Sequence, residues 1–184
     1  MQTELNSLPL RGNTILEIVE NDHETIKGLL TSLTRDAGRS ERVRTLEQLK
    51  GALTIHNAME ENLIYPALDK VAGRKTETMK LYNETASADI LVFEIDSMLK
   101  EGGDDAKFAE KAEKLRAAVF EHIEDEEKKA LPHLEEGADS RESQLLLQSV
   151  REFRNAVRFT PGSPASGRME TGEIGRDATS RETR

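Results

Sequence analysis

Residues 121–134 read EHIEDEEKKALPHL, and residues 55–68 read IHNAMEENLIYPAL. Each stretch places a histidine four residues before a glutamate, a second glutamate directly after the first, and a proline ten residues after the histidine. Side chains at positions i and i+4 of an α-helix project from the same face, so His56 with Glu60, and His122 with Glu126, can each point to one place. One such pair is common on a charged helix. Two copies with the same trailing residues predict a shared function.

The composition favours long helices and restricts the chemistry. Of the 184 residues, 33% are charged, only 4% are aromatic and none is cysteine. This length and balance fit one all-α domain with appendages. Without cysteine, a bound metal would have to be held by His, Asp or Glu. The net charge of -9 and the lack of a basic stripe argue against a nucleic-acid partner. With no long apolar run and no signal-like start, we expect a soluble cytoplasmic protein without a membrane partner.

Apolar residues recur at helical spacing over four long segments, and short glycine-containing connections separate them. We predict helices at 13–35, 40–71, 76–100 and 104–136. The expected N-caps that follow the glycine turns are Ser40, Thr76 and Asp104. Short connections make successive helices antiparallel neighbours, which predicts an up-down-up-down four-helix bundle over residues 10–136.

Two segments follow the predicted bundle. Residues 137–159 include an amphipathic helix at 140–157, which has one apolar face: Leu146, Val150, Phe153 and Val157. This helix could cover the end of the bundle or pair with a second copy, so the chain is expected to be a monomer or a homodimer. Residues 160–184 lack any apolar period and are expected to form a disordered tail.

The interior stripe of each predicted helix is apolar except at a few positions. Those positions hold three imidazoles and three carboxylates: His23, His56, Glu60, Glu84, His122 and Glu126. Residue counts from the hairpin turns, at about 1.5 Å per residue, put them at similar heights. Burying a single unpaired carboxylate costs several kcal/mol, so three at one level require a cation.

Imidazole and carboxylate donors suit iron, with manganese or zinc as alternatives. Six protein ligands are enough for two metal ions about 3.5–4 Å apart, bridged by Glu60 and Glu126. The ligand from the third helix stays open, because a different rotation of that helix would offer Asp89 or Asn83 in place of Glu84.

Several neighbouring residues have simpler interpretations. Glu61 and Glu127 are expected to be solvated, although Glu127 also lies at a possible ligand spacing from the preceding histidine. His133 is expected to interact with a helix dipole. Tyr65 and Tyr82 are expected to pack in the core, and a hydrogen bond from either one to a ligand is the alternative.

The stretch NDHETIKGLL (21–30) and the two repeated stretches together resemble the hemerythrin family, specifically its bacterial HHE cation-binding branch, over about residues 10–136. The resemblance implies a four-helix bundle with a non-haem di-iron centre on His23, His56, Glu60, His122 and Glu126. Oxygen-carrying hemerythrins have two histidines in their third helix, whereas LYNETASADILVFEI (81–95) has none. The interior stripe of the third predicted helix offers Glu84 as a ligand instead of these histidines.

A carboxylate in place of imidazole makes a site harder and favours oxidised iron. This argues against reversible dioxygen carriage, which needs a di-ferrous site and stays only as an alternative. The resemblance implies peroxide or nitric oxide handling in oxidative or nitrosative stress, including catalase-like decomposition of peroxide at the metal pair. No catalytic residue beyond the metal centre is assigned. An iron- or oxygen-sensing module is the competing class. Ferritin-like oxidation would require Glu-x-x-His spacing, which the chain lacks, and a plain helical scaffold leaves the interior glutamates unexplained.

Overall fold

The structure is a computed structural model that describes residues 8–102 and 104–157. The predicted tail at 160–184 lies outside the described residues. The elements of the described part are all helical: α1 (Ile15–Leu33), α2 (Arg39–Met59), the π-helical turn η1 (Glu60–Ile64), α3 (Tyr65–Ala72), α4 (Lys75–Glu101), α5 (Asp105–Asp125), the π-helical turn η2 (Glu126–Ala130), α6 (Leu131–Gly137) and α7 (Ser140–Ala156).

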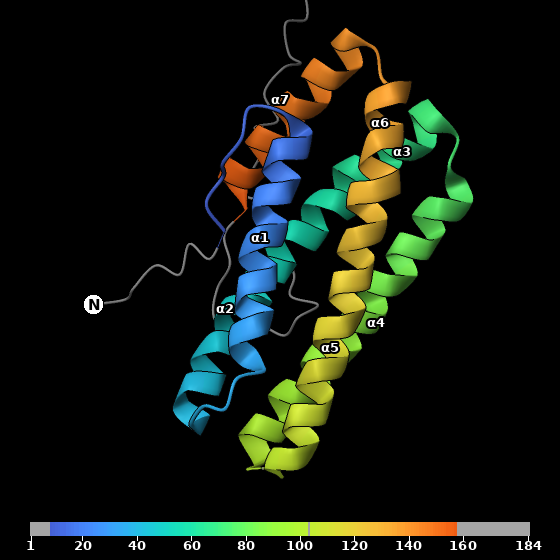
Figure 1. Ribbon diagram of the computed structural model, residues 1–184. Helices are drawn as coiled ribbons and strands as arrows, with labels where there is room; N and C mark the ends of the chain where they lie inside the picture. Colours follow the sequence, from blue (N-terminus) through green and yellow to red (C-terminus); the bar gives the residue numbers. More distant parts are fainter. Residues whose placement is uncertain (1–7, 103, 158–184) are drawn as a thin grey trace, which may run out of the picture.

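Two of the four rods of the bundle are composite. α2, η1 and α3 follow one another without a break, as do α5, η2 and α6, and α1 and α4 complete the antiparallel set (Figure 1). Hairpin partners α1 and α2, and α4 and α5, pack along each other, and α3 packs against α6 at the other end. The predicted all-α, up-down-up-down bundle with an added C-terminal helix is confirmed.

The helix ends follow local capping chemistry. The Thr14 hydroxyl accepts the Glu17 N–H, and the Asp104 carboxylate accepts the Ala106 N–H, as expected for Asp104. Gly73 and Gly102 end their helices with φ values of 62° and 75°, which favour glycine.

Two expected N-caps are wrong. Ser40 lies inside α2, because Arg42 N–H already bonds to the Gly38 carbonyl. Thr76 lies inside α4, because Thr78 N–H bonds to the Arg74 carbonyl.

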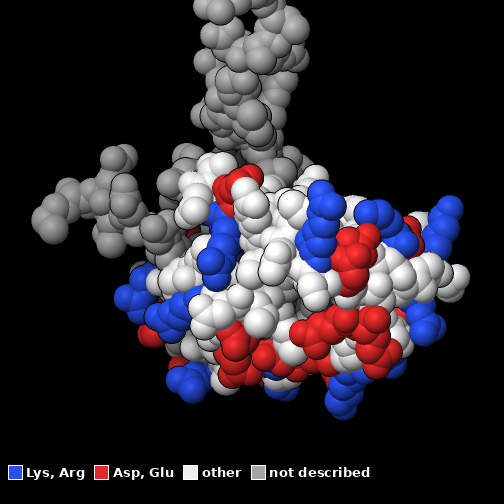
Figure 2. Space-filling model, turned by 90° about the horizontal axis from the view of Figure 1, so that it is seen from above, with Lys and Arg blue, Asp and Glu red and all other residues white. Residues whose placement is uncertain are grey.

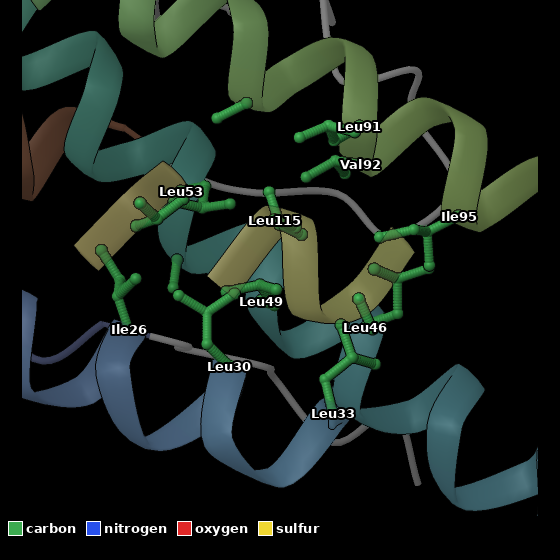
Figure 3. Packing of buried hydrophobic residues seen from close by; sticks show 14 of the residues in the cluster. Ile26, Leu30, Leu33, Leu46, Leu49, Leu53, Leu91, Val92, Ile95 and Leu115 are labelled. Carbon is green, nitrogen blue, oxygen red and sulfur yellow. The ribbon is translucent and has the colours of Figure 1, made fainter. Parts of the chain in front are cut away.

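The apolar interior forms two clusters with a polar layer between them. The first cluster lies toward the α1–α2 and α4–α5 hairpins, and Figure 3 shows its packing around Leu30, Leu49 and Leu115. The second surrounds Tyr65 and Leu68 toward the other end. The members of the polar layer are buried: His23, His56, Glu60, His122 and Glu126.

The two π-helical turns change which residues face inward. A regular helix would carry the interior stripe from Glu60 to Leu63 and Ala67, but the structure buries Ile64, Tyr65 and Leu68. The wide turn adds one residue, with Tyr65 N–H bonded to the Glu60 carbonyl five residues back. Proline follows directly in both rods and cannot donate the next helical hydrogen bond. The repeated proline therefore marks the π-turns.

Helix α7 packs on the bundle, against α1, α2 and η1. It starts with a capping box between Asp139 and Glu142, and it buries Val150 completely. This matches the first of the two predicted roles, in which the helix covers the bundle. Pairing with a second copy stays a prediction. Within the described residues, no helix has the length and apolar character needed to cross a bilayer.

Candidate metal centre

Four buried side chains from four elements converge in the polar layer. They are His23 of α1, His56 of α2, Glu60 of η1 and Glu126 of η2, and one nitrogen or oxygen atom from each lies within 4.8 Å of the others. His56 Nε2 is 3.1 Å from Glu60 Oε1, and His23 Nε2 is 3.2 Å from Glu126 Oε2. The two imidazole rings meet edge to face, with centroids 4.9 Å apart.

His122 borders this group and Glu84 lies behind it. His122 Nε2 is 3.4 Å from Glu126 Oε1, whereas its Nδ1 is 3.1 Å from Glu84 Oε2. The structure therefore brings five of the six predicted ligands to one place. Glu84, with a side chain 23% exposed, contacts the opposite side of the His122 ring. Its role as a direct ligand stays a prediction.

The two alternatives for the third-helix ligand differ in environment. Asn83 is exposed, and Asp89 is half-buried. Burial, together with the charge of Glu61, raises the pKa of Asp89 to about 6. Neither residue belongs to the group of converging atoms, and Glu84 does not either, so the ligand from the third helix stays a prediction.

Tyr65 belongs to the site itself. Its hydroxyl donates to Glu126 Oε1 at 2.6 Å, lies 3.1 Å from Glu60 Oε2 and is 3.5 Å from His122 Nε2. The hydrogen bond to a ligand, which was the alternative interpretation, is the observed one. Tyr82 donates instead to the Glu61 carbonyl at 2.9 Å, the oxygen whose helical donor Pro66 lacks.

Glu127 is not solvated as expected. Its Oε1 lies 2.9 Å from His23 Nδ1 and 3.1 Å from Lys27 Nζ, and the side chain is only 29% exposed. His133 contacts Glu77 at 3.1 Å, so it pairs with a side chain of α4. The contact of a carboxylate with an outer ring nitrogen, as in Glu127 with His23, is therefore a feature that the interior-stripe pattern did not predict.

Asp22 is a buried residue beside the site that the sequence reasoning missed. It is 1% exposed, and its Oδ2 lies 3.5 Å from His56 Nδ1 and accepts a hydrogen bond from Arg154. A signal was present, because Asp22 lies four residues after Ile18 and four before Ile26, and both isoleucines are buried.

Burial and charge separate the two carboxylates of the centre. Burial, with the neighbouring charge of Glu126, raises the pKa of Glu60 well above its usual value. Burial acts in the same direction on Glu126, but the imidazoles of His122 and His23 outweigh it and lower its pKa to about 2. Burial disfavours the charged, protonated form of His23, yet the carboxylates of Glu126 and Glu127 outweigh it and raise the pKa of this imidazole. The metal-free centre thus balances its charges internally.

A cation fits the donor atoms that this arrangement leaves over. His23 Nε2, His56 Nε2 and Glu126 Oε2 are buried and have no hydrogen-bond partner among the described residues. Each of these atoms nevertheless lies 3.1–3.2 Å from another potential metal-ligand atom of the group. Buried polar atoms without partners are rare in proteins, and lone pairs that point together are what a metal ion requires.

The chain is similar to known proteins in sequence and in fold. A curated DNA nickase of Nostoc sp. is 20% identical over 153 residues, which are 83% of this chain and 42% of that protein, so the chain spans less than half of its length. The crystal structure of a hemerythrin HHE cation-binding domain-containing protein from Mycobacterium kansasii matches with a TM-score of 0.63 and 19% identity, covering 78% of this chain and 89% of that one. The family described as the hemerythrin HHE cation-binding domain matches residues 14–134. The chain belongs to the hemerythrin HHE cation-binding family.

Proposed function

We propose that this chain is a non-haem di-iron protein that handles peroxide or nitric oxide in oxidative or nitrosative stress. The observation that carries the proposal is the convergence of unpartnered imidazole nitrogens on two buried carboxylates. The ligands would be His23, His56 and His122 through Nε2, with Glu60 and Glu126 through their carboxylates. Manganese and zinc are the competing ions for the same donor set.

The positions of the carboxylate oxygens support two ions. Glu126 turns Oε2 toward His23 at 3.2 Å and Oε1 toward His122 at 3.4 Å, so its two oxygens serve different histidines. Glu60 turns Oε1 toward His56 and Oε2 toward the Tyr65 hydroxyl. A carboxylate whose two oxygens face different side chains, as in Glu126, suits a bridge between two ions in a two-metal site.

A narrow cleft beside the site supports a small ligand. His56 and His122 form part of its wall with apolar side chains that include Leu53, Ala88 and Val119. Its volume of about 10 Å³ is close to the room that one water molecule needs. Bound iron would supply the redox chemistry, and the cleft would limit access to molecules of the size of peroxide, nitric oxide or dioxygen.

Metal analysis tests this function directly. We expect two iron ions per chain in aerobically loaded protein, with oxo-bridged ferric bands in the near ultraviolet. Glu126→Gln should bring the iron content below one per chain, because it removes a charged bridging ligand. Glu124→Gln, an exposed change two residues away, is the control and should retain two ions. Fewer than two ions in the unaltered chain would contradict the di-iron proposal.

Turnover separates the reaction from metal storage. We expect iron-loaded protein to release oxygen from hydrogen peroxide, or to consume nitric oxide, at a rate that the Glu126→Gln variant loses. If two irons are bound and neither small molecule is consumed, the stress reaction is wrong and the metal site stands.

A sensing module is the second candidate, and the packing of α7 against η1 favours it, because η1 begins with the ligand Glu60. Metal binding that changes η1 would change the docking of α7. Limited proteolysis of metal-free and iron-loaded protein tests this function. Equal cleavage after α7 in both forms would exclude it.

The relative from Nostoc is a DNA nickase, but we propose no nucleic-acid function for this chain. The net charge is -9, and on the end of the molecule shown in Figure 2 acidic side chains gather along one edge with basic ones around them. Backbone contacts to DNA would require a basic surface. Conversion of supercoiled plasmid to open circles by the loaded protein would contradict this.

A cysteine-free chain also suits the reducing cytoplasm, where we propose that it works.

A further inference from the structure

Helix α7 reaches the metal centre through one buried ion pair. Arg154, with a side chain 2% exposed, donates a hydrogen bond from Nη1 to Oδ2 of Asp22. The same oxygen lies 3.5 Å from Nδ1 of His56, and the Nε2 of that ring lies 3.1 Å from Glu60. Arg154 lies outside residues 14–134, which the family matches.

A similar arrangement occurs at all three histidines of the site, with a hydrogen bond on Nδ1 at His23 and His122 and a longer contact of 3.5 Å at His56, whose Nδ1 has no hydrogen-bond partner among the described residues. Each imidazole turns Nε2 toward the carboxylates of the centre and Nδ1 toward an outer carboxylate, which in turn contacts a cation. The three sets are His23, Glu127 and Lys27; His122, Glu84 and Lys80; and His56, Asp22 and Arg154. A recurring geometry at every histidine indicates that the outer groups serve the rings.

The set with Arg154 differs from the other two in its burial. Lys27 and Lys80 are 27% and 52% exposed, so water screens their pairing. Asp22 and Arg154 have side chains 1% and 2% exposed, so water screens this pair little. Removing one partner would leave the other as an uncompensated buried charge.

A carboxylate on Nδ1 decides what the other ring nitrogen can do. An imidazole that donates Nδ1–H to an acceptor has its free lone pair on Nε2, which is the metal-binding atom in this site. Asp22 still has a free acceptor, since its Oδ1 has no hydrogen-bond partner among the described residues. At 3.5 Å the Asp22–His56 contact is longer than a typical hydrogen bond, so the position of Asp22 determines whether it can form.

We propose that α7 is part of the metal centre: Arg154 positions Asp22, and Asp22 holds His56 in the orientation and tautomer that present Nε2 to the metal. Arg154 also donates from Nη2 to the Leu8 carbonyl at 2.8 Å, so its guanidinium joins α7, α1 and the segment before α1 around one carboxylate. Both are positioning residues. The inference rests on the proposed metal site.

The first test reads the tautomer of His56 in metal-free protein by nitrogen-15 NMR, with the signal assigned by loss in His56→Gln. We expect the proton on Nδ1 in the unaltered chain, and a mixture of tautomers in Arg154→Met and Asp22→Asn. Val150→Ala is the matched control, because it removes buried packing from the same helix without touching the ion pair. An unchanged tautomer in both variants would overturn the proposal.

The second test measures iron loss to a chelator from loaded protein. We expect loss about tenfold or more faster in Arg154→Met and in Asp22→Asn, the range typical for removed outer partners of metal-bound histidines. The double variant should lose iron no faster than the faster single variant, because the two residues act in one chain of contacts. Val150→Ala should be near the unaltered rate. Independent, multiplied effects, or an equal effect of Val150→Ala, would contradict the positioning role.

The two tests separate this inference from the proposed function. If the tautomer responds to Arg154→Met but the unaltered chain binds no iron, the di-iron function fails and the positioning of His56 by α7 holds. If iron binds and neither the tautomer nor the rate of loss responds, the role of α7 fails and the metal site holds.

Discussion

At the scale of single residues, the Tyr65 hydroxyl has an unusual position between two buried carboxylates. It donates to Glu126 at 2.6 Å and lies 3.1 Å from Glu60, and the tyrosine ring is 1% exposed. Burial and the charges of Glu60 and Glu126 raise the pKa of this hydroxyl well above its usual value, so the group stays a proton donor. In metal-free protein it is the neutral donor that separates the two acids.

Tyr65→Phe should therefore destabilise the metal-free protein by about 1–3 kcal/mol, the usual cost of leaving a buried polar group without its partner. The loss should be smaller in metal-loaded protein, where a cation compensates the carboxylates. Chemical denaturation of both forms measures the difference. Tyr82→Phe is the control, because within the described residues the Tyr82 hydroxyl bonds only to the Glu61 carbonyl, and equal losses are expected in both forms. Equal losses for Tyr65→Phe would contradict this role.

Asp89 gives a pH dependence outside the metal ligands. Its pKa is raised by burial and by Glu61 to about 6, so folding favours its protonated form. Well below pH 3.8, the usual pKa of an aspartate, the carboxyl is protonated in both folded and unfolded states and costs nothing. As the pH rises from 4 through 6, ionisation lowers the stability of the folded state.

Asp89→Asn should thus raise the free energy of unfolding at pH 7–8 by about 1–2 kcal/mol, a value reduced for partial solvent screening. The gain should vanish as the pH falls below 4. Denaturant titrations of metal-free protein at several pH values measure it, with the fully exposed Asp36→Asn as control. A gain that does not depend on pH would show that another cause is responsible.

At the scale of elements, the π-turns allow one rod to present three groups to the site. In a regular helix at 100° per residue, Tyr65 would lie about 140° around from Glu60. The extra residue of η1 brings Tyr65 to roughly the angle of an i+4 neighbour, which is where the structure has it, against Glu60 and Glu126. Such turns are common at functional sites. The insertion, followed by Pro66, therefore places the Tyr65 hydroxyl at the candidate metal site.

Deleting Asn62 together with Pro66→Ala should remove the π-turn and keep the fold. Asn62 is exposed, and without it the buried residues Ile64, Tyr65 and Leu68 fall at regular helical spacing from Glu60. We expect a change in unfolding free energy within about 2 kcal/mol by circular dichroism melting, in the range of ordinary substitutions. Deleting Asn57 from regular helix instead should unfold the protein, because it rotates the whole downstream rod. Similar losses for both deletions would contradict the role of η1.

At the scale of the whole molecule, the metal centre lies between two separate apolar clusters. The hairpin-side cluster holds the four rods together without contributing a proposed ligand, and the other cluster includes Tyr65 and Val150 of α7. Buried carboxylates weaken a core, and two flanking clusters supply the burial that offsets this cost. A substitution in the hairpin-side cluster should therefore lower the stability of the fold without changing metal binding.

Leu115→Ala should show this separation. Leu115 is fully buried in the hairpin-side cluster, two helical turns before His122 (Figure 3). We expect a loss of about 2–5 kcal/mol in unfolding free energy with no change in metal stoichiometry at temperatures where the variant is folded. Ile90→Ala, a change at an exposed position, should cost little. Metal loss in folded Leu115→Ala would show that the clusters and the site are coupled.

The four rods, their antiparallel order and five residues of the candidate site could be predicted from the sequence alone. The rods follow from local periodicity, and the site residues follow from their places in apolar stripes. Each of these patterns lies along a single helix. The structure buries all five residues: His23, His56, Glu60, His122 and Glu126. Helical spacing also explains why the repeated His–Glu pairs were found together.

Which groups lie on the outer ring nitrogens depends on how the rods pack, and the sequence did not predict it. Glu127, Glu84 and Asp22 each meet a histidine of another rod, and Arg154 approaches from a helix 132 residues after Asp22. The π-turns also had no periodic signal, because one inserted residue shifts every later position by a third of a turn. Contacts between rods depend on rotation and height at a precision of a few ångströms, and a pattern along a single rod does not contain that information.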